Sequence, residues 1–153
     1  MLPGKAYEDL YKEIADKISS ARIKASSELG NILSSLYYSI GEIIYERQKQ
    51  EGWGTSIIKR LSLDLKRNFI AEEGFSESNL EYMRRFYLEY KGSPDLLKLA
   101  KKVPWGHNML LLQKVKEGKE KEFYLKATAM HGWSRSVLLN QIKFNAYRSL
   151  ILS

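Results

Sequence analysis

Four basic side chains between residues 55 and 68 have the spacing of a phosphate-binding surface. They form two pairs seven residues apart, and each pair shares one face of a helix: Lys59 with Lys66, and Arg60 with Arg67. Lysine and arginine at such positions contact phosphate groups, which orient a protein on nucleic acid without reading its sequence. The structural alternative is an ion pair within the helix, since Asp64 follows Arg60 by four residues.

A second polar group lies on the helical pattern that begins after Gly74-Phe75-Ser76. Asparagine can bond an adenine edge, and arginine can bond a guanine edge or a phosphate. The candidate contacts on this helix are Ser78, Asn79, Arg84 and Arg85. The alternatives are a capping role for Asn79 and, for the arginines, a solvated face or pairing with Glu81 and Glu89. Two short helices joined by a tight, glycine-containing turn predict a helix-turn-helix over residues 55–90, in which the second helix enters a DNA groove.

Two further candidates for phosphate binding lie at predicted helix starts. His107 follows Pro104-Trp105-Gly106, and the free N–H groups of a helix N-terminus attract anions. Arg135 lies just inside the last predicted helix. A capping or packing role is the favoured alternative for His107. For Arg135 the alternative is a salt bridge, because the helix dipole disfavours a cation near an N-terminus.

Helical periodicity runs through the whole chain. Apolar residues recur at steps of three and four from Tyr7 to Ile44, and no proline interrupts residues 5–50. This segment is predicted as one long helix or two nearly collinear helices. Further helical patterns follow to at least Tyr147, and no segment alternates with a period of two. The expected fold is all-α with about seven helices, in which the N-terminal helix packs on a helix-turn-helix-containing bundle.

Three predicted helices are each preceded by a glycine, an aromatic residue and a small residue. If the small residue is the N-cap, the aromatic residue takes the position from which a hydrophobic staple packs on the first turn. The staple accounts for the aromatic side chains and disfavours their alternative role as platforms for base stacking. The triplets are Gly52-Trp53-Gly54, Gly74-Phe75-Ser76 and Gly132-Trp133-Ser134.

The net charge of +7 is unevenly distributed along the chain. Residues 1–50 carry seven Lys/Arg and seven Asp/Glu, whereas residues 51–153 carry 18 and 11. A basic segment attracts polyanions such as nucleic acid, although a lysine-rich solvated surface gives the same count. We expect one domain made of a neutral helical arm, residues 1–50, and a basic body, residues 51–153. Any DNA contacts should lie on the body.

Composition disfavours several other classes of protein. The chain has no cysteine and only two histidines, so disulfides and cysteine-based zinc sites are impossible, and we expect no metal or cofactor. No apolar run approaches the roughly 20 residues that span a bilayer, and no signal-peptide pattern is present, so a cytoplasmic protein without membrane contact is expected. Pro94-Asp95 and Glu117-Gly118-Lys119 imitate a nuclease signature, but no strand pattern surrounds them, so no catalytic residue is expected.

Several longer motifs occur in an order that resembles a known family. They are Gly52-Trp53-Gly54, Arg60-Leu61-Ser62-x-Asp64-Leu65, Gly74-Phe75-Ser76-x-x-Asn79-Leu80-x-Tyr82-Met83-Arg84-x-Phe86-Tyr87, Pro104-Trp105-Gly106-His107-Asn108 and Gly132-Trp133-Ser134-Arg135. From about residue 37 to residue 142 the chain resembles the N-terminal domain of the DUF1016 (YhcG-like) proteins. In that family the domain usually precedes a PD-(D/E)XK nuclease-like domain. The resemblance therefore implies a role in DNA transactions with a nuclease domain, in cis or in trans.

The sequence favours a DNA-binding or DNA-targeting module that serves a nuclease-like domain. That domain would follow Ser153, so no residue of this chain is assigned a role in its nuclease chemistry. The chain alone is therefore expected not to be an enzyme. The alternative is a protein–protein interaction or dimerisation module without nucleic-acid contact. Such a module would use the N-terminal helix, through which the chain would form a homodimer, and a tyrosine-rich surface of Tyr37, Tyr38 and Tyr45.

Overall fold

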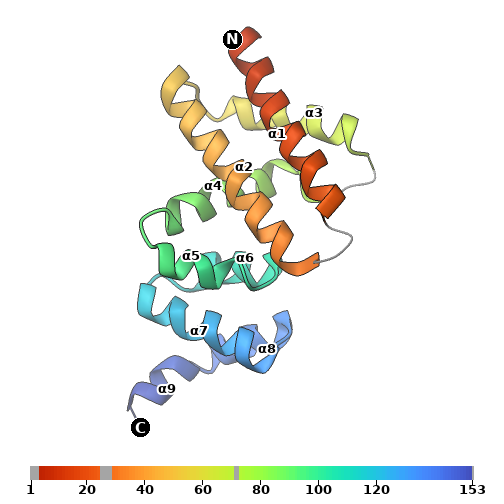
Figure 1. The fold of residues 1–153 in the computed structure, drawn as a ribbon. Helices are drawn as coiled ribbons and strands as arrows, with labels where there is room; N and C mark the ends of the chain where they lie inside the picture. Colours follow the sequence, from red (N-terminus) through yellow and green to blue (C-terminus); the bar gives the residue numbers. More distant parts are fainter. Residues whose placement is uncertain (1–3, 25–28, 71–72, 153) are drawn as a thin grey trace. The chain divides into compact units, whose positions relative to one another are not determined.

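The computed structural model describes residues 4–24, 29–70 and 73–152, and every regular element in these ranges is an α-helix (Figure 1). The predicted all-α class is therefore confirmed, with nine helices in the described part of the chain instead of about seven. In chain order they are α1 (Gly4–Lys24), α2 (Leu29–Glu51), α3 (Ser56–Asn68), α4 (Glu77–Tyr90), α5 (Pro94–Ala100), α6 (Trp105–Lys114), α7 (Gly118–His131), α8 (Arg135–Lys143) and α9 (Ala146–Leu152).

The chain divides into two compact units, each made of two separate segments of the sequence. The first unit comprises Met1–Glu28 and Ser35–Glu89, so it holds α1, α3 and most of α2 and α4. The second unit comprises Leu29–Ser34 and Tyr90–Ser153, so it holds the start of α2 and all of α5 to α9. Most of the expected N-terminal arm thus shares a unit with the expected helix-turn-helix pair.

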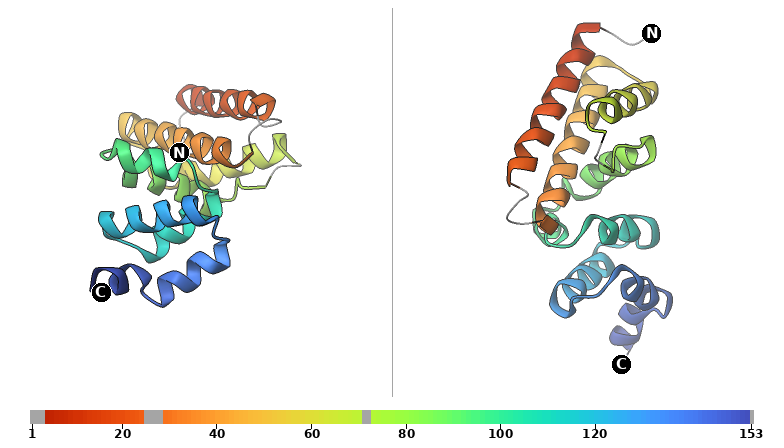
Figure 2. Two further views of the ribbon diagram at one scale, coloured as in Figure 1. Left: turned by 60° about the horizontal axis from the view of Figure 1, so that its bottom comes forward. Right: turned by 90° about the vertical axis from the view of Figure 1, so that its right-hand side faces the viewer.

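The N-terminal helical segment folds back on itself. α1 and α2 are separate helices that lie side by side and run in opposite directions (Figures 1 and 2), and Arg47 Nη2 of α2 lies 3.4 Å from Glu13 Oε2 of α1. This corrects the expectation of one long helix or two collinear ones; Ala25, within that pattern, lies outside the described residues. The physical reason is burial of the apolar stripe of α1, where four side chains are at most 2% exposed: Tyr7, Leu10, Ile14 and Ile18.

α2 and α4 cross at a glycine. A Cβ atom on Gly41 would lie 1.9 Å from the carbonyl oxygen of Met83, so no larger residue fits unless a backbone moves. Near this crossing, Ile44 and Phe86 are at most 1% exposed, and the Tyr38 and Phe86 rings pack edge to face with centroids 6.0 Å apart. The crossing fixes the helix that carries four of the predicted DNA contacts.

Eight residues, 69–76, separate α3 from α4. A helix-turn-helix has a turn of three or four residues, so the helix-turn-helix prediction is not confirmed. The connection is anchored by buried side chains. Phe69 and Phe75 are 9% and 4% exposed, with ring centroids 6.1 Å apart, and Ser62 Oγ donates a 2.6 Å hydrogen bond to Phe75 O. These contacts hold the start of α4 against α3.

The second unit is a stack of short helices with its own core. α5 contacts α7, α6 contacts α8, and α9 contacts both α7 and α8. Leu111, Tyr124 and Leu138 are fully buried. Ser34 Oγ donates a 2.8 Å hydrogen bond to Val103 O, which ties the start of α2 into this unit.

Candidate nucleic-acid interface

The two candidate lysines of α3 lie on its solvent side. The buried face of α3 consists of Ile57, Ile58, Leu61, Ser62 and Leu65. Lys59 and Lys66 are exposed, as their shared face predicts. Neither forms an ion pair or hydrogen bond within the described ranges, so both side chains are accessible to a phosphate.

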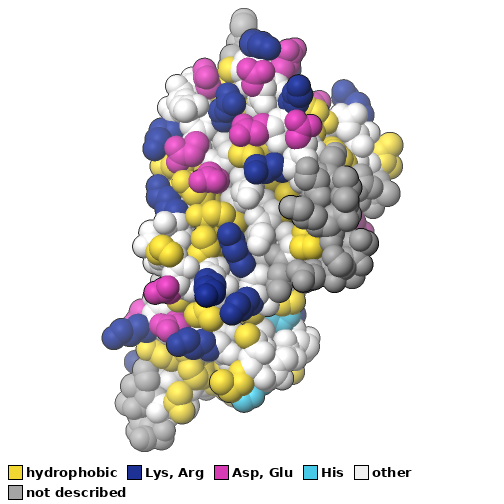
Figure 3. All heavy atoms as spheres, viewed as in Figure 1, with side chains coloured by type: hydrophobic (Ala, Val, Ile, Leu, Met, Phe, Trp, Pro, Cys, Tyr) yellow, Lys and Arg dark blue, Asp and Glu magenta, His cyan; other side chains and the backbone are white. Residues whose placement is uncertain are grey.

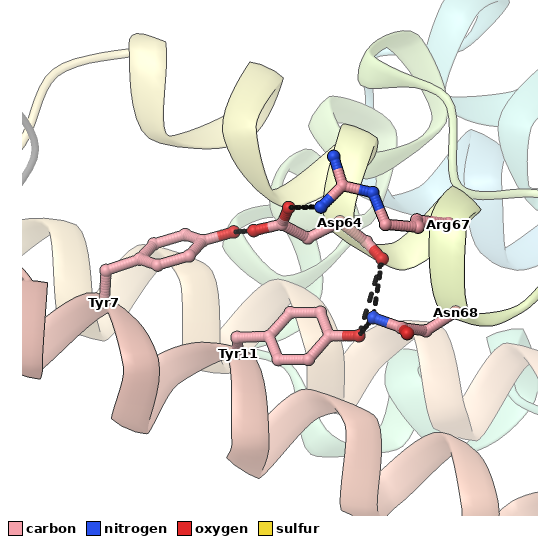
Figure 4. Close-up of polar contacts among 5 residues, drawn as sticks. All are labelled: Tyr7, Tyr11, Asp64, Arg67 and Asn68. Carbon is pink, nitrogen blue, oxygen red and sulfur yellow. Dashed lines mark hydrogen bonds and ion pairs between the residues drawn. The ribbon is translucent and has the colours of Figure 1, made fainter.

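The two candidate arginines of α3 have partners within the first unit. The Arg60 guanidinium lies over the Tyr7 ring of α1, 3.9 Å from its centroid, as a cation–π contact. Arg67 Nη1 lies 3.8 Å from Asp64 Oδ1, and Tyr7 Oη donates a 2.6 Å hydrogen bond to Asp64 Oδ2 (Figure 4). Asp64 thus pairs with Arg67 and not with Arg60, its expected partner.

The same segment of α3 anchors α1. Asn68 Nδ2 donates hydrogen bonds to Tyr11 Oη and, at 3.1 Å, to Asp64 O, and Tyr11 Oη donates to Asp64 O at 3.4 Å (Figure 4). Burial, reinforced by the hydrogen bond to Asp64, holds the pKa of Tyr7 well above its ordinary value. The Tyr7 hydroxyl therefore stays protonated and remains a donor at neutral pH. Arg60 packs on this network through the Tyr7 ring, whereas Arg67 makes a largely exposed pair with Asp64 at its edge.

At the start of α4 the candidate side chains differ in their roles. Ser76 Oγ accepts a 3.1 Å hydrogen bond from Asn79 N, which confirms Ser76 as an N-cap. Asn79 Nδ2 donates a 2.6 Å hydrogen bond to Gly74 O, so this side chain closes the loop before α4. That contact is structural, but it differs from the capping role given as the alternative for Asn79. Ser78 is exposed.

Further along α4, Arg84 is half-buried and held by three groups. Its Nε donates a 2.8 Å hydrogen bond to Gln48 Oε1, its Nη1 lies 3.2 Å from Glu81 Oε1, and its guanidinium is 5.4 Å from the Tyr45 ring centroid. The pairing with Glu81 that was weighed as an alternative is therefore present. Arg85 is exposed and is the more accessible of the two arginines.

The remaining two candidates lie in the second unit, where α6 and α8 begin. His107 is 8% exposed, and its Nε2 forms a 2.7 Å hydrogen bond with Trp133 O, which is the packing role favoured for it. Arg135 is exposed, and its stem lies over Gly106, where an added Cβ would meet Arg135 Cδ at 3.5 Å. The Arg135 guanidinium is therefore the accessible group of this pair.

The basic excess of the chain lies entirely in the second unit. That unit contains 12 Lys/Arg and four Asp/Glu, whereas the first unit contains 13 and 14. Lys and Arg side chains gather over the region of α5 and α7 (Figure 3). The exposed cations of the second unit are Lys91, Lys98, Lys102, Lys114, Lys116, Lys119, Lys126, Arg135, Lys143 and Arg148.

Three of these cations form a group on neighbouring helices. Lys98 on α5, Lys102 just after it and Lys119 on α7 have no ion pair in the described part of the chain; we call them the α5–α7 lysines. Lys126, by contrast, lies 2.8 Å from Glu122. Sequence reasoning missed this group because it averaged the charge over residues 51–153. Residues 51–89 carry six Lys/Arg and seven Asp/Glu, so a count restricted to the residues after 89 would have found it.

Neither a metal site nor a membrane-spanning helix is found in the part of the chain that the structure describes. No group of three His, Asp or Glu side chains there could hold a metal ion. None of the helices in the same ranges has an apolar stretch long enough to cross a bilayer. The described residues form an all-α protein whose second unit is basic.

Comparison with known proteins identifies the family. The chain belongs to the family of DUF1016 N-terminal domains, whose model matches residues 13–149. It is also similar to a protein of Escherichia coli (strain K12) described as "Putative nuclease YhcG". The two sequences are 28% identical over an alignment of 179 residues, and the match covers 96% of this chain and 47% of that protein. The chain therefore spans about half the length of this relative. No solved structure gives a significant match.

Proposed function

We propose that this chain is a DNA-binding module that serves a nuclease. The observation that carries the proposal is the concentration of accessible positive charge on one of the two units, which has a net charge of +8 against −1 for the other. DNA phosphates attract such a surface, and the release of condensed counterions favours binding. In this proposal the α5–α7 lysines contact the phosphate backbone, and the partners of the first-unit arginines keep most of them in structural roles.

The relationship to a nuclease supports DNA as the partner. The relative is described as a nuclease, and more than half of its length lies outside the match with this chain. We therefore assign nucleic-acid binding to the matched region and phosphodiester hydrolysis to the region beyond it, in cis or in trans. On this assignment the present chain is not itself the enzyme.

Some candidates from the sequence add contacts in this proposal. The exposed candidates are Lys59, Lys66, Arg67, Ser78, Arg85 and Arg135. The candidates with partners inside the chain are Arg60, Arg67, Asn79, Arg84, Arg85 and His107. Because the exposed set consists mainly of cations suited to phosphates, binding should depend weakly on DNA sequence.

A salt series with a labelled DNA duplex tests the proposal. If several phosphates are contacted, the logarithm of the association constant should fall linearly with the logarithm of salt concentration, with a slope of about −0.9 per contact. Fluorescence anisotropy of the duplex measures both quantities on the full chain. Absence of binding even at low salt, or binding that salt leaves unchanged, would contradict the proposal.

Exposed apolar side chains favour a second candidate function, protein–protein interaction. In the second unit, Met130 and Phe144 are 77% and 79% exposed. The tyrosine surface expected for such a module is largely covered, since Tyr37 is 5% exposed and the Tyr38 ring packs on Tyr87 with centroids 5.3 Å apart. Light scattering after size exclusion tests this function. A dimer that Phe144→Ser dissociates would support it, and a monomer that binds DNA would favour the first proposal.

A further inference from the structure

A pocket of about 300 Å³ lies in the first unit beside the end of α2. The last turns of α2 contribute Tyr45, Gln48 and Lys49, the segment before α3 contributes Trp53 and Thr55, and α4 contributes Arg84. This volume is at the lower end of the range for small-molecule sites. The pocket can therefore hold a small organic group but cannot admit a double helix.

A glycine and a glutamine fix the walls of this pocket. Gly52 has a φ of +66°, the left-handed conformation that ends α2, and Trp53 N donates a 3.1 Å hydrogen bond back to Gln48 O. The Gln48 side chain donates to Gly54 O at 3.2 Å and accepts from Arg84 Nε at 2.8 Å. One side chain thus holds both the loop of Trp53 and the Arg84 guanidinium, so the pocket is organised before a ligand arrives.

The charged lining of the pocket is positive. Lys49 Nζ and Arg84 Cζ lie 5.5 and 5.4 Å from the centroid of the same Tyr45 ring. Glu46 lies 3.6 Å from Lys49 and Glu81 lies 3.2 Å from Arg84, but neither carboxylate lines the pocket. Arg84 Nη2 has no partner among the described residues. Lysine and arginine in this arrangement suit a phosphate group.

Trp53 supplies an aromatic wall. Its Nε1 is buried and has no hydrogen-bond partner among the described residues. The staple expected for Trp53 is displaced, because the N-cap of α3 is Thr55 and not Gly54. Trp53 and Tyr45 therefore form an aromatic lining suited to a planar ring.

We propose that this pocket binds a single nucleotide, with its phosphate on Arg84 and Lys49 and its base against Trp53. Two cations alone would suit inorganic phosphate, whereas the aromatic lining adds a place for a base. A free mononucleotide and an unpaired nucleotide within a strand offer the same chemistry. The inference rests on the proposed function, because a strand held here would give the nuclease-associated module a preference for unpaired DNA.

Titration of the full chain with dAMP and with a short single-stranded oligonucleotide tests the proposal by calorimetry. Trp53→Leu keeps an apolar side chain and removes the aromatic wall, and Lys49→Gln removes an exposed charge. Each should weaken binding of both ligands about tenfold. Lys12→Gln is the matched control, since Lys12 is exposed in the same unit and does not line the pocket; it should change either affinity less than about twofold. Thermal melts followed by circular dichroism verify that each variant is folded.

The outcomes separate this inference from the proposed function. If Trp53→Leu and Lys49→Gln bind both ligands as the parent does, the inference is overturned, and it is also overturned if inorganic phosphate binds as tightly as dAMP. Duplex binding measured in parallel tests the proposed function alone. Pocket variants that lose dAMP while no protein binds a duplex would support the inference and overturn that function. Tighter binding of the oligonucleotide than of dAMP would identify the strand as the ligand, and equal affinity would identify the free nucleotide.

Discussion

The candidate arginines of α3 in the first unit and the α5–α7 lysines in the second unit use their positive charges in different ways. Arg60 lies over the Tyr7 ring, and Arg67, although exposed, lies 3.8 Å from Asp64. In the second unit ten cations are exposed, and the α5–α7 lysines have no ion pair in the described part of the chain. A motif rich in arginine therefore need not be a binding surface. Whether a cation is available to a ligand depends on whether it already contacts another side chain of the fold.

The largest effect on stability should come from filling the helix crossing of the first unit. Gly41→Ala should lower the free energy of unfolding by more than about 3 kcal/mol, because the added Cβ would lie 1.9 Å from Met83 O. Urea denaturation followed by circular dichroism measures the change. Gly92→Ala is the control in the second unit, where nothing lies within 4 Å of the added atom, and it should cost less than about 0.5 kcal/mol. Equal losses would contradict the tight crossing.

Alkaline pH should destabilise the first unit through its buried tyrosines. Burial and the hydrogen bond to Glu46 raise the pKa of Tyr87 to about 12, and the pKa of Tyr7 is raised in the same direction. An unfolded tyrosine titrates near pH 10, so the unfolded state releases its protons first. Stability present below about pH 10 is therefore lost as the pH rises to about 12. Melting temperatures across this interval measure the loss, which Tyr87→Phe should reduce; an identical loss in that variant would contradict the assignment.

Removal of one hydroxyl from the network between α1 and α3 should have a smaller effect. Tyr7→Phe deletes a 2.6 Å hydrogen bond to a carboxylate and should lower the free energy of unfolding by about 1–3 kcal/mol. Tyr11→Phe is the comparison: it deletes the 3.4 Å bond to Asp64 O and the bond from Asn68 Nδ2, and it should cost less because neither bond involves a charged group. Denaturant titration of both variants gives the difference. A greater loss for Tyr11→Phe would show that the carboxylate contact is not the anchor.

The smallest stability effects should be similar in the two units. Ser76→Ala removes a cap of α4 and Ser134→Ala a cap of α8, and each should cost about 1 kcal/mol. Ser78→Ala is the control, because Ser78 is exposed and lies inside the helix. Thermal denaturation of the three variants measures the cost. Caps that prove neutral would mean that tertiary packing alone sets the helix starts.

Local features of the fold could be predicted from the sequence. The helical class follows from periodicity, and Ser76 and Ser134 cap their helices because an N-cap depends only on residues three positions away. The exposure of Lys59 and Lys66 follows from their shared helix face. The start of α3 was placed one residue early, at Gly54 instead of Thr55, because both are small residues before the same helical pattern.

Long-range features could not be predicted in this way. No proline in the sequence marks the change of direction between α1 and α2. The reversal depends on burial of the apolar stripes of both helices. The partners of Arg60 and Asp64 include Tyr7, which is more than 50 residues away and on another helix. The charge of each unit could be counted only after the structure showed which segments belong together. For this reason the α5–α7 lysines were not among the candidates.

Duplex binding by two charge-matched variants tests the central claim most directly. One variant carries Lys98→Gln, Lys102→Gln and Lys119→Gln in the second unit; the other carries Lys5→Gln, Lys12→Gln and Lys17→Gln on α1, so both lose three exposed positive charges. The account predicts that the second-unit variant binds weakly and that its salt slope becomes shallower by about 2.7, while the α1 variant keeps the parental slope. If both variants weaken equally, or if only Lys59→Gln with Lys66→Gln abolishes binding, the second unit is not the DNA-binding surface.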